Sequence, residues 1–255
     1  DVRHGALFAS DLNALLECDD LPRTLDPAAH HSPLAYLWTP APRTLLAGIE
    51  KLEPGCAIVV RQGKIARRWA YYELPYDGDR LPGSPNDIAA ELRDRLAAAV
   101  ERQLVADVPV GAFLSGGLDS SAVVAMMQRA NGGLPDRCYT IGLAGARTVE
   151  GTPSDLPYAR RVAASLGVRL ETIEVGPDII EHLDEMLFHL DEPQADPAPI
   201  NALLIARQAR ADGIPVLLSG AGGDDIFSGY RRHHALRLER LWSWLPHATR
   251  SGLAR

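Results

Sequence analysis

From residue 108 onward, short apolar runs alternate with longer stretches in which apolar residues recur at helical spacing. The short runs are rich in β-branched residues and read "VPVGAFLS" (108–115), "RCYTIGL" (137–143), "VRLETIEV" (168–175) and "IPVLLSG" (214–220). The longer stretches cover residues 120–130, 156–167, 179–190 and 199–213. Strands that alternate with helices of ten or more residues indicate parallel pairing through right-handed crossovers. The pattern therefore predicts an α/β domain with a doubly wound parallel sheet.

The expected helix boundaries carry recognisable end signals. Ser84, Pro85 and Asp87 occupy the positions of an N-cap, a first-turn proline and an acidic third residue. Gly167 and Gly213 each stand between a predicted helix and the next strand, where a left-handed residue ends a helix well. After the start at Ser84, apolar residues recur at four-residue spacing, namely Ile88, Leu92, Leu96 and Val100. We therefore predict an amphipathic helix that opens the α/β domain.

The first 80 residues have a different pattern, rich in proline and turn residues. The stretch "GCAIVVRQGKIARRWAYYEL" (55–74) alternates apolar and polar positions on either side of Gln62-Gly63, as a β-hairpin does. A break follows at "LPYDGDRLPGSPND" (74–87). We predict two domains, a β-rich one over residues 1–80 and the α/β domain over residues 85–255.

The composition argues against several classes of partner and site. The 255 residues are 46% hydrophobic and carry a formal net charge of -7, which argues against nucleic acid as the main partner. No apolar run reaches the length of a signal peptide core or a spanning helix, so we expect a soluble chain without a membrane partner. The three cysteines, Cys18, Cys56 and Cys138, are far apart and form no CxxC pair. They suggest neither disulfides nor zinc, and a cytoplasmic location fits.

The stretch "FLSGGLDSS" (113–121) follows a predicted strand and precedes a predicted helix. Glycines at such a turn let backbone N–H groups approach an anion, while the helix directs its positive end to the same place. A phosphate is the natural ligand, to which Ser115, Ser120 and Ser121 can add hydroxyl donors. Asp119 would repel a phosphate unless a divalent cation lay between them, so magnesium is implied. The plainer alternative is an ordinary glycine turn with a capping aspartate.

A second strand ends in a similar way at "LLSGAGGDDIFSGYRR" (217–232). We expect Asp224 or Asp225 to supply a second carboxylate to the cation held by Asp119, and we favour Asp224. The alternative is that an aspartate caps a helix entering at Ile226, and we expect at least one of the two to do so. The phosphate turn contains neither GxxxxGK[ST] nor GxGxxG, so it is not a Walker A loop or a dinucleotide fingerprint.

The stretch SGGLDSS resembles the PP-loop of the ATP pyrophosphatases. Together with "HLDEPQADPAPI" (189–200) and "LSGAGGDDIFSGY" (218–230), it resembles the synthetase domain of the asparagine synthetase B family over most of residues 85–240. The stretches "LFASDLNALL" (7–16) and "PRTLLAGIEKLEPGCAIVV" (42–60) resemble the last part of that family's class II, N-terminal-nucleophile glutaminase domain. Both predicted domains are incomplete by comparison with the family, so we expect a segment of a longer protein.

The resemblance implies an ATP-dependent, amide-forming ligase of the asparagine synthetase type. Such an enzyme activates a carboxylate, aspartate or a similar acid, as an acyl-adenylate, releases pyrophosphate, and lets ammonia from glutamine capture the acyl group. The implied ligands are ATP, magnesium and an amino-acid carboxylate, and a homodimer is an assembly that the resemblance allows. By itself, this segment is expected to be inactive.

The resemblance also implies roles for individual residues. Asp119, Asp224 and Tyr230 are the expected catalytic residues, and the two aspartates hold the metal. Tyr230 and the Asp191-Glu192-Pro193 turn border the acyl substrate. Pyrophosphate and adenosine are bound by the remaining set, which comprises Leu114, Ser115, Gly116, Gly117, Asp119, Ser120, Ser121, Ile141, Ser219 and Gly220.

Some positions depart from the family pattern. Ala221 stands where an acidic residue associated with the acyl-adenylate is common, and Asp225 stands where glutamate is usual. The family's N-terminal cysteine nucleophile is not in this chain, and its phosphate-balancing lysine would lie beyond Arg255. Three alternatives therefore stay open: a synthetase for another amide or a β-lactam, a PP-loop enzyme that modifies tRNA or a nucleotide, and a non-catalytic binding protein.

Overall fold

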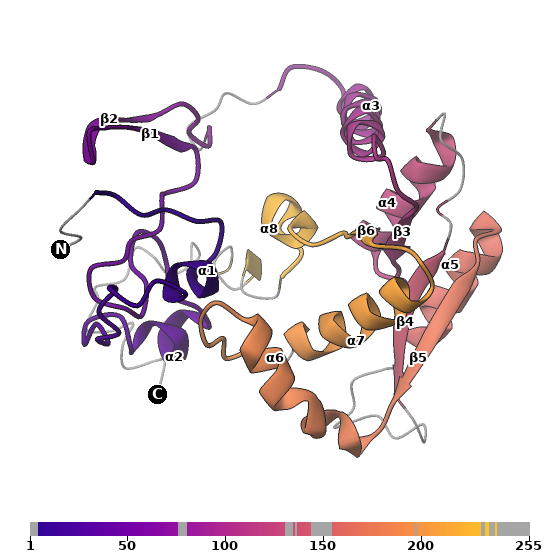
Figure 1. Ribbon diagram of the computed structural model, residues 1–255. Helices are drawn as coiled ribbons and strands as arrows, with labels where there is room; N and C mark the ends of the chain where they lie inside the picture. The colour runs from indigo at the N-terminus through magenta and orange to yellow at the C-terminus, as the bar shows by residue number, and fades with distance from the viewer. Residues whose placement is uncertain are drawn as a thin grey trace. The chain divides into compact units, whose positions relative to one another are not determined.

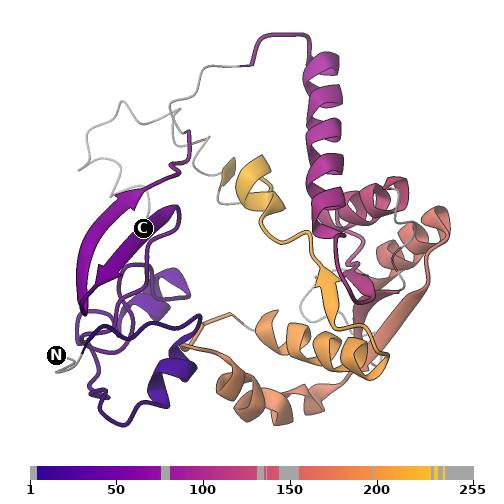
Figure 2. The same ribbon diagram turned by 45° about the horizontal axis from the view of Figure 1, so that its top comes forward.

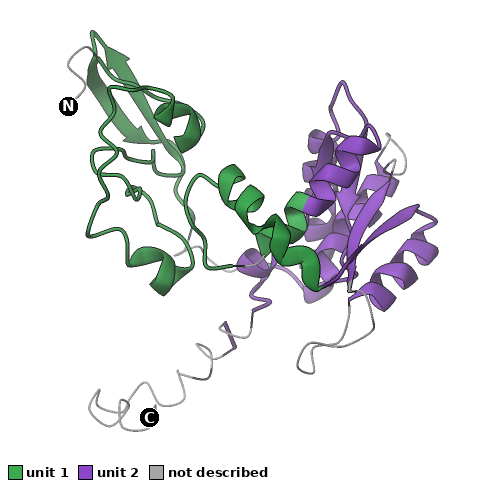
Figure 3. Ribbon diagram, turned by 60° about the horizontal axis from the view of Figure 1, so that its bottom comes forward, with its two compact units in different colours: residues 1–82, 177–203 green, residues 83–176, 204–255 purple. Residues whose placement is uncertain are grey.

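The computed structural model describes residues 5–75, 81–130, 135, 137–143, 155–196, 198–230, 233–234 and 238. The chain forms two compact units, shown in green and purple in Figure 3. Unit 1 comprises Asp1–Pro82 and Pro177–Leu203, and unit 2 comprises Gly83–Gly176 and Leu204–Arg255. The sequence did not indicate that residues 177–203 would group with the N-terminal segment. The domain division at residues 80–85 stays a prediction.

Unit 2 is built on a four-stranded parallel sheet (Figure 1). Its strands are β3 (Val110–Phe113), β4 (Cys138–Leu143), β5 (Leu170–Val175) and β6 (Val216–Leu218), in the order β5-β4-β3-β6. β3 lies at the point where the order reverses, with Gly111 opposite Leu217 of β6 and Phe113 opposite Tyr139 of β4. Because parallel strands end at the same edge, the loops that follow β3 and β6 emerge side by side.

The helices of unit 2 are α3 (Pro85–Gln103), α4 (Leu118–Arg129), α5 (Leu156–Leu166), the C-terminal part of α7 (Ala198–Ala211), and α8 (Gly223–Phe227). The start of α3 and the ends of α5 and α7 lie where the sequence signals predict them. Ser84 and Asp87 form a capping box at the start of α3. Gly167 ends α5 with φ +67°, and Gly213 follows α7 with φ +80°, left-handed values that glycine adopts without strain.

Helices pack on both faces of the sheet, as strand alternation requires. Ala112, Leu114 and Cys138 point to one face, where they meet α4 and α5 in the larger core cluster. Tyr139 points to the other face and packs with Ile205. Ile205 belongs to α7, which lies beside β4 in Figure 1. This two-sided burial explains why the strands read as nearly continuous apolar runs. The predicted doubly wound α/β fold is confirmed.

Unit 1 contains the predicted hairpin, drawn as two long arrows in Figure 2. β1 (Cys56–Arg61) and β2 (Lys64–Ala70) pair antiparallel around Gln62 and Gly63. Both turn residues have positive φ, 49° and 72°, which matches the tight hairpin turns that suit twisted strands. The hairpin prediction is confirmed.

The remaining elements of unit 1 are short: α1 (Leu12–Leu16), α2 (Ser32–Tyr36), the 3-10 helix Pro177–His182, α6 (Leu183–His189) and the start of α7. The single helix predicted over residues 179–190 is therefore a 3-10 turn followed by an α-helix. Within the described ranges, none of the helices combines the length and apolar character that crossing a lipid bilayer would take.

Candidate ATP-binding site

The turn between β3 and α4 has a shape that only glycine permits. Gly116 adopts φ +82°, and a Cβ there would lie 2.6 Å from the carbonyl carbon of Tyr158. Gly117 is the N-cap of α4, so the helix begins at Leu118, two residues before the predicted stretch of residues 120–130. α4 is twelve residues long. The free N–H groups of its first turn and the positive end of its dipole point toward this turn.

Serine hydroxyls hold the turn together. Ser120 is buried, and its Oγ lies 3.0 Å from Ser115 Oγ and accepts from the Ser115 N–H at 3.3 Å. The Ser121 hydroxyl donates to the Gly117 carbonyl oxygen at 2.6 Å. These bonds fix the serine side chains relative to the backbone of the turn. Their predicted use as donors to a phosphate stays a prediction.

The loop after β6 packs directly on the first turn of α4. A Cβ on Gly220 would lie 2.5 Å from the backbone nitrogen of Ser120 and 2.8 Å from the carbonyl carbon of Asp119. A Cβ on Gly223 would lie 2.5 Å from Oδ2 of Asp119. The segments that follow the two strands are therefore in contact. The Asp119 carboxylate faces Gly223, the residue before Asp224.

The helix that follows this loop begins earlier than predicted. α8 starts at Gly223 with Gly222 as its N-cap, and no side chain caps it. Gly222 adopts φ +89°, and the Gly223 N–H donates to the Gly220 carbonyl oxygen at 3.2 Å, so the chain turns before it reaches the acids. The prediction that Asp224 or Asp225 caps a helix at Ile226 is therefore wrong. Both aspartates lie within the first turn instead.

The two candidate metal ligands differ in their surroundings. The Asp119 carboxylate lies against Gly223, whereas Oδ1 of Asp224 lies against Gly229. Among the described residues no cluster of three or more histidine, cysteine or acidic residues could hold a metal by itself. Magnesium, however, is commonly bound by one or two carboxylates together with substrate phosphates and waters. The Asp119 carboxylate, in the first turn of α4, could supply one such oxygen ligand.

The other predicted ligands of ATP, and Tyr230, which is predicted to border the acyl substrate, differ in their surroundings. The Leu114 side chain is fully buried in the core, so only its backbone could border a nucleotide. Ile141 is half-buried and packs against the cluster around Tyr139. Ser219 is exposed, and its Oγ accepts from the Ala221 N–H at 3.0 Å. The ring of Tyr230 lies 5.5 Å from that of His233.

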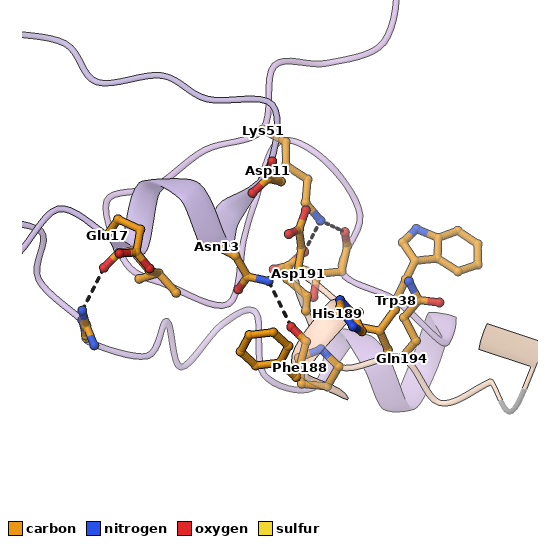
Figure 4. A pocket seen from close by; sticks show the side chains of 15 residues that line it. Asp11, Asn13, Glu17, Trp38, Lys51, Phe188, His189, Asp191 and Gln194 are labelled. Carbon is orange, nitrogen blue, oxygen red and sulfur yellow. Dashed lines mark hydrogen bonds and ion pairs between the residues drawn. The ribbon is translucent and has the colours of Figure 1, made fainter. Parts of the chain in front are cut away.

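A second cluster, which motif reading missed, lies in unit 1. Glu192 is 9% exposed, forms an ion pair with Lys51, and accepts from the Leu45 N–H at 2.6 Å. Glu192 and Leu45 are 147 residues apart, and no local pattern signals a pairing over that separation. The neighbouring Asp191 is exposed and lines a cavity of about 830 Å³ (Figure 4).

A polar cluster also lies at the opposite end of the strands. The Tyr139 hydroxyl donates to Asp212 at 2.9 Å, and Arg137 pairs with the same carboxylate at 2.8 Å. The hydrogen bond from Tyr139 and the pairing with Arg137 lower the pKa of Asp212. Burial, followed by the bond to Asp212, raises the pKa of Tyr139 to about 12. This network fixes the amino-terminal end of β4.

Comparison with known proteins shows the family to which the chain belongs. A family model described as Asparagine synthase matches residues 91–255. The chain belongs to the asparagine synthase family. It is 33% identical to a putative asparagine synthetase (glutamine-hydrolyzing) of Mycobacterium tuberculosis over 263 residues, which cover 98% of this chain and 38% of that protein. It is 29% identical to asparagine synthetase (glutamine-hydrolyzing) 1 of Bacillus subtilis, covering 90% of this chain and 35% of that protein.

The chain thus spans less than half the length of these members of the family. Among solved structures, it is similar to a glutamine-dependent NAD+ synthetase of Acinetobacter baumannii in complex with ADP. That similarity has a TM-score of 0.41 at 18% identity and covers 66% of this chain and 34% of the synthetase.

Proposed function

We propose that this chain is the ATP-binding part of an ATP-dependent amide-forming ligase of the asparagine synthetase type. The reaction would activate a carboxylate as an acyl-adenylate, release pyrophosphate, and let ammonia derived from glutamine capture the acyl group. The observation that carries the proposal is the contact between the two strand ends, where Gly220 and Gly223 pack on Ser120 and Asp119. Membership of the asparagine synthase family supports the same function.

In this proposal, the backbone does most of the phosphate binding. The N–H groups around Gly116 and Gly117 and the positive end of α4 would hold the β- and γ-phosphates. Ser115 and Ser120 would keep the turn in shape through their mutual hydrogen bond. Such donors stabilise developing charge efficiently because they need no rearrangement during the reaction.

Asp119 would hold a magnesium ion at the start of α4, and Asp224, the residue after Gly223, would be its second carboxylate ligand. Bound magnesium would neutralise phosphate charge and favour departure of pyrophosphate. Asp119 would be the principal ligand. Because Gly223 has no side chain, the loop after β6 can pack directly against the Asp119 carboxylate.

The acid substrate would lie beside Tyr230, in the loop region that follows β6. Ala221 brings no carboxylate to this place and is exposed at the turn after β6. That absence favours a second candidate, a synthetase for a different amide or a β-lactam, with the same adenylation step on another acid.

The direct test is ATP–pyrophosphate exchange by the full-length protein that contains this segment, in the presence of Mg²⁺ and a panel of amino-acid carboxylates that begins with L-aspartate. We expect exchange that depends on both the metal and one acid of the panel. Exchange with L-aspartate would identify the asparagine synthetase reaction, whereas exchange with another acid would identify the second candidate. ATP binding without exchange for any acid would contradict both and identify a non-catalytic nucleotide-binding protein.

A further inference from the structure

Gly229 is a glycine at a position whose backbone does not require one. Its φ lies outside the left-handed range, unlike the φ of Gly116 or Gly222. A Cβ on Gly229 would lie 2.7 Å from Cγ and 3.2 Å from Cβ of Asp224, and the three atoms nearest to it all belong to the Asp224 side chain. The space that a side chain would fill at position 229 is therefore taken by the Asp224 carboxylate.

The contact follows from the way in which α8 ends. Ser228 adopts φ +63°, and its N–H and the N–H of Gly229 both donate to the Asp224 carbonyl oxygen, the latter at 3.0 Å. The second of these bonds is that of a Schellman motif, which brings the side chains of the two bonded residues together and frequently fills their contact with apolar groups. Here a carboxylate lies on a glycine instead. The turn thus fixes Asp224 by its carbonyl oxygen and leaves its carboxylate against bare backbone.

The direction of the Asp224 side chain matters because of the residue before it. A Cβ on Gly223 would lie 2.5 Å from Oδ2 of Asp119, so Asp224 is one peptide unit from a residue that touches the Asp119 carboxylate. The backbone therefore brings the two acids close together. Aspartate can adopt several staggered χ1 rotamers, and the rotamer then decides whether both carboxylates reach one ion. The open space at Gly229 admits the rotamer that the structure shows.

We propose that Gly229 is a positioning residue for the second metal carboxylate, because its missing side chain selects the rotamer in which Asp224 reaches the ion held by Asp119. The inference rests on the proposed function, in which these two aspartates bind magnesium. Magnesium requires nearly ideal octahedral geometry, so a displaced ligand weakens its binding. Gly229 acts through Asp224 and takes no direct part in the chemistry.

The variant Gly229→Ala tests the proposal in the full-length protein that contains this segment. The atoms that it displaces belong to the end of a side chain, which can rotate away, so the melting temperature should fall by no more than about 2 °C. The Mg²⁺ concentration that gives half-maximal ATP binding, measured by titration calorimetry, should rise at least about tenfold. The matched control is Ser228→Gly, which changes the same turn, keeps the space beside Asp224 open, and should keep the wild-type Mg²⁺ requirement.

A double-mutant cycle shows whether Gly229 acts through Asp224. Asp224→Ala should itself raise the Mg²⁺ requirement at least about tenfold, and Gly229→Ala added to it should change that requirement by less than about twofold. Independent effects, which multiply in the double variant, would overturn the inference. An unchanged Mg²⁺ requirement in Gly229→Ala would overturn it as well. So would a lower one, because the contact would then hold Asp224 away from the ion.

A second variant serves if Gly229→Ala does not fold. Asp224→Glu keeps the charge but moves the carboxylate away from position 229, so it should also raise the Mg²⁺ requirement at least about tenfold, and wild-type behaviour would overturn the inference. If wild-type ATP binding does not depend on Mg²⁺, or if Asp224→Ala binds like the wild type, the proposed metal site fails and the positioning role fails with it. A wild-type Mg²⁺ requirement in Gly229→Ala beside a raised one in Asp224→Ala would overturn the positioning role alone.

Discussion

Two glycines, Gly116 and Gly220, let backbone segments touch where a side chain would hold them apart. Gly116 fits against the start of α5, and Gly220 fits against the first turn of α4. Their neighbours at these contacts include backbone atoms, which cannot swing away as the end of a flexible side chain can. Even a small side chain added at either glycine should therefore disturb the candidate site, because backbone atoms would have to move.

The clearest case is Gly220→Ala. The added Cβ would lie 2.5 Å from the backbone nitrogen of Ser120, so the loop after β6 must move away from Asp119. Overpacking of this kind costs about 1–3 kcal/mol. We expect ATP affinity to fall at least about tenfold, measured by titration calorimetry, with a lower melting temperature. The adjacent Ala221→Ser adds an atom at an exposed position and should leave the melting temperature within about 1 °C. Wild-type affinity in Gly220→Ala would show that the two loops need not touch.

A second residue-scale prediction concerns Cys138, which is fully buried in β4. Burial raises the pKa of its thiol from 9.0 to about 12. Because the folded-state pKa lies above the unfolded value, this contribution to stability is complete below pH 9 and is lost as the pH rises toward 12. Between about pH 9 and 11, the wild type should lose up to about 1 kcal/mol of unfolding free energy per pH unit more than Cys138→Ala does.

Denaturant unfolding at several alkaline pH values measures this difference. The control is Val175→Ala, which removes buried apolar atoms but no titratable group and should follow the wild-type slope. Parallel slopes for wild type and Cys138→Ala would refute the buried-thiol account.

At the scale of elements, the sequence predicted helix ends and the hairpin turn best where the signal residues lie next to the boundary. The start of α3 and the ends of α5 and α7 follow from Ser84, Gly167 and Gly213, each acting on its immediate neighbours. The hairpin follows from Gln62-Gly63 in the same way. α8 was placed wrongly because its start depends on how the loop after β6 closes over Asp119, a tertiary contact that propensity does not encode.

The capping box of α3 offers a test at this scale. Asp87 Oδ2 accepts from the Ser84 N–H at 3.1 Å, and the Asp87 N–H donates to Ser84 Oγ at 3.3 Å. Ser84→Ala removes the hydroxyl and should lower the unfolding free energy by about 1 kcal/mol. The comparison variant is Ser165→Ala, at an exposed site inside α5, which should be neutral or slightly stabilising. Equal stability of Ser84→Ala and wild type would mean that this helix end contributes little.

At the scale of the whole molecule, the candidate site could be predicted from sequence because its parts are contiguous motifs at strand ends. The parallel order places the ends of β3 and β6 next to each other, and the motifs supply the glycines and acids. The grouping of residues 177–203 with the N-terminal segment could not be predicted. It depends on the Lys51–Glu192 pair and its companions, which join residues far apart in the chain. Such pairings leave no periodic trace in the sequence.

The central claim is that Asp119 and the turn of residues 115–121 bind ATP together with magnesium. The most direct measurement is calorimetric titration of ATP into wild type and Asp119→Asn, each with Mg²⁺ and with EDTA. We expect wild-type binding to require Mg²⁺, and Asp119→Asn to lose at least about 100-fold in affinity while it keeps the wild-type circular dichroism spectrum, because a neutral amide cannot offset the dehydration of the cation. Asp178→Asn, in the exposed 3-10 helix of unit 1, should bind like the wild type. Binding by Asp119→Asn that equals the wild type, or wild-type binding indifferent to Mg²⁺, would contradict the account.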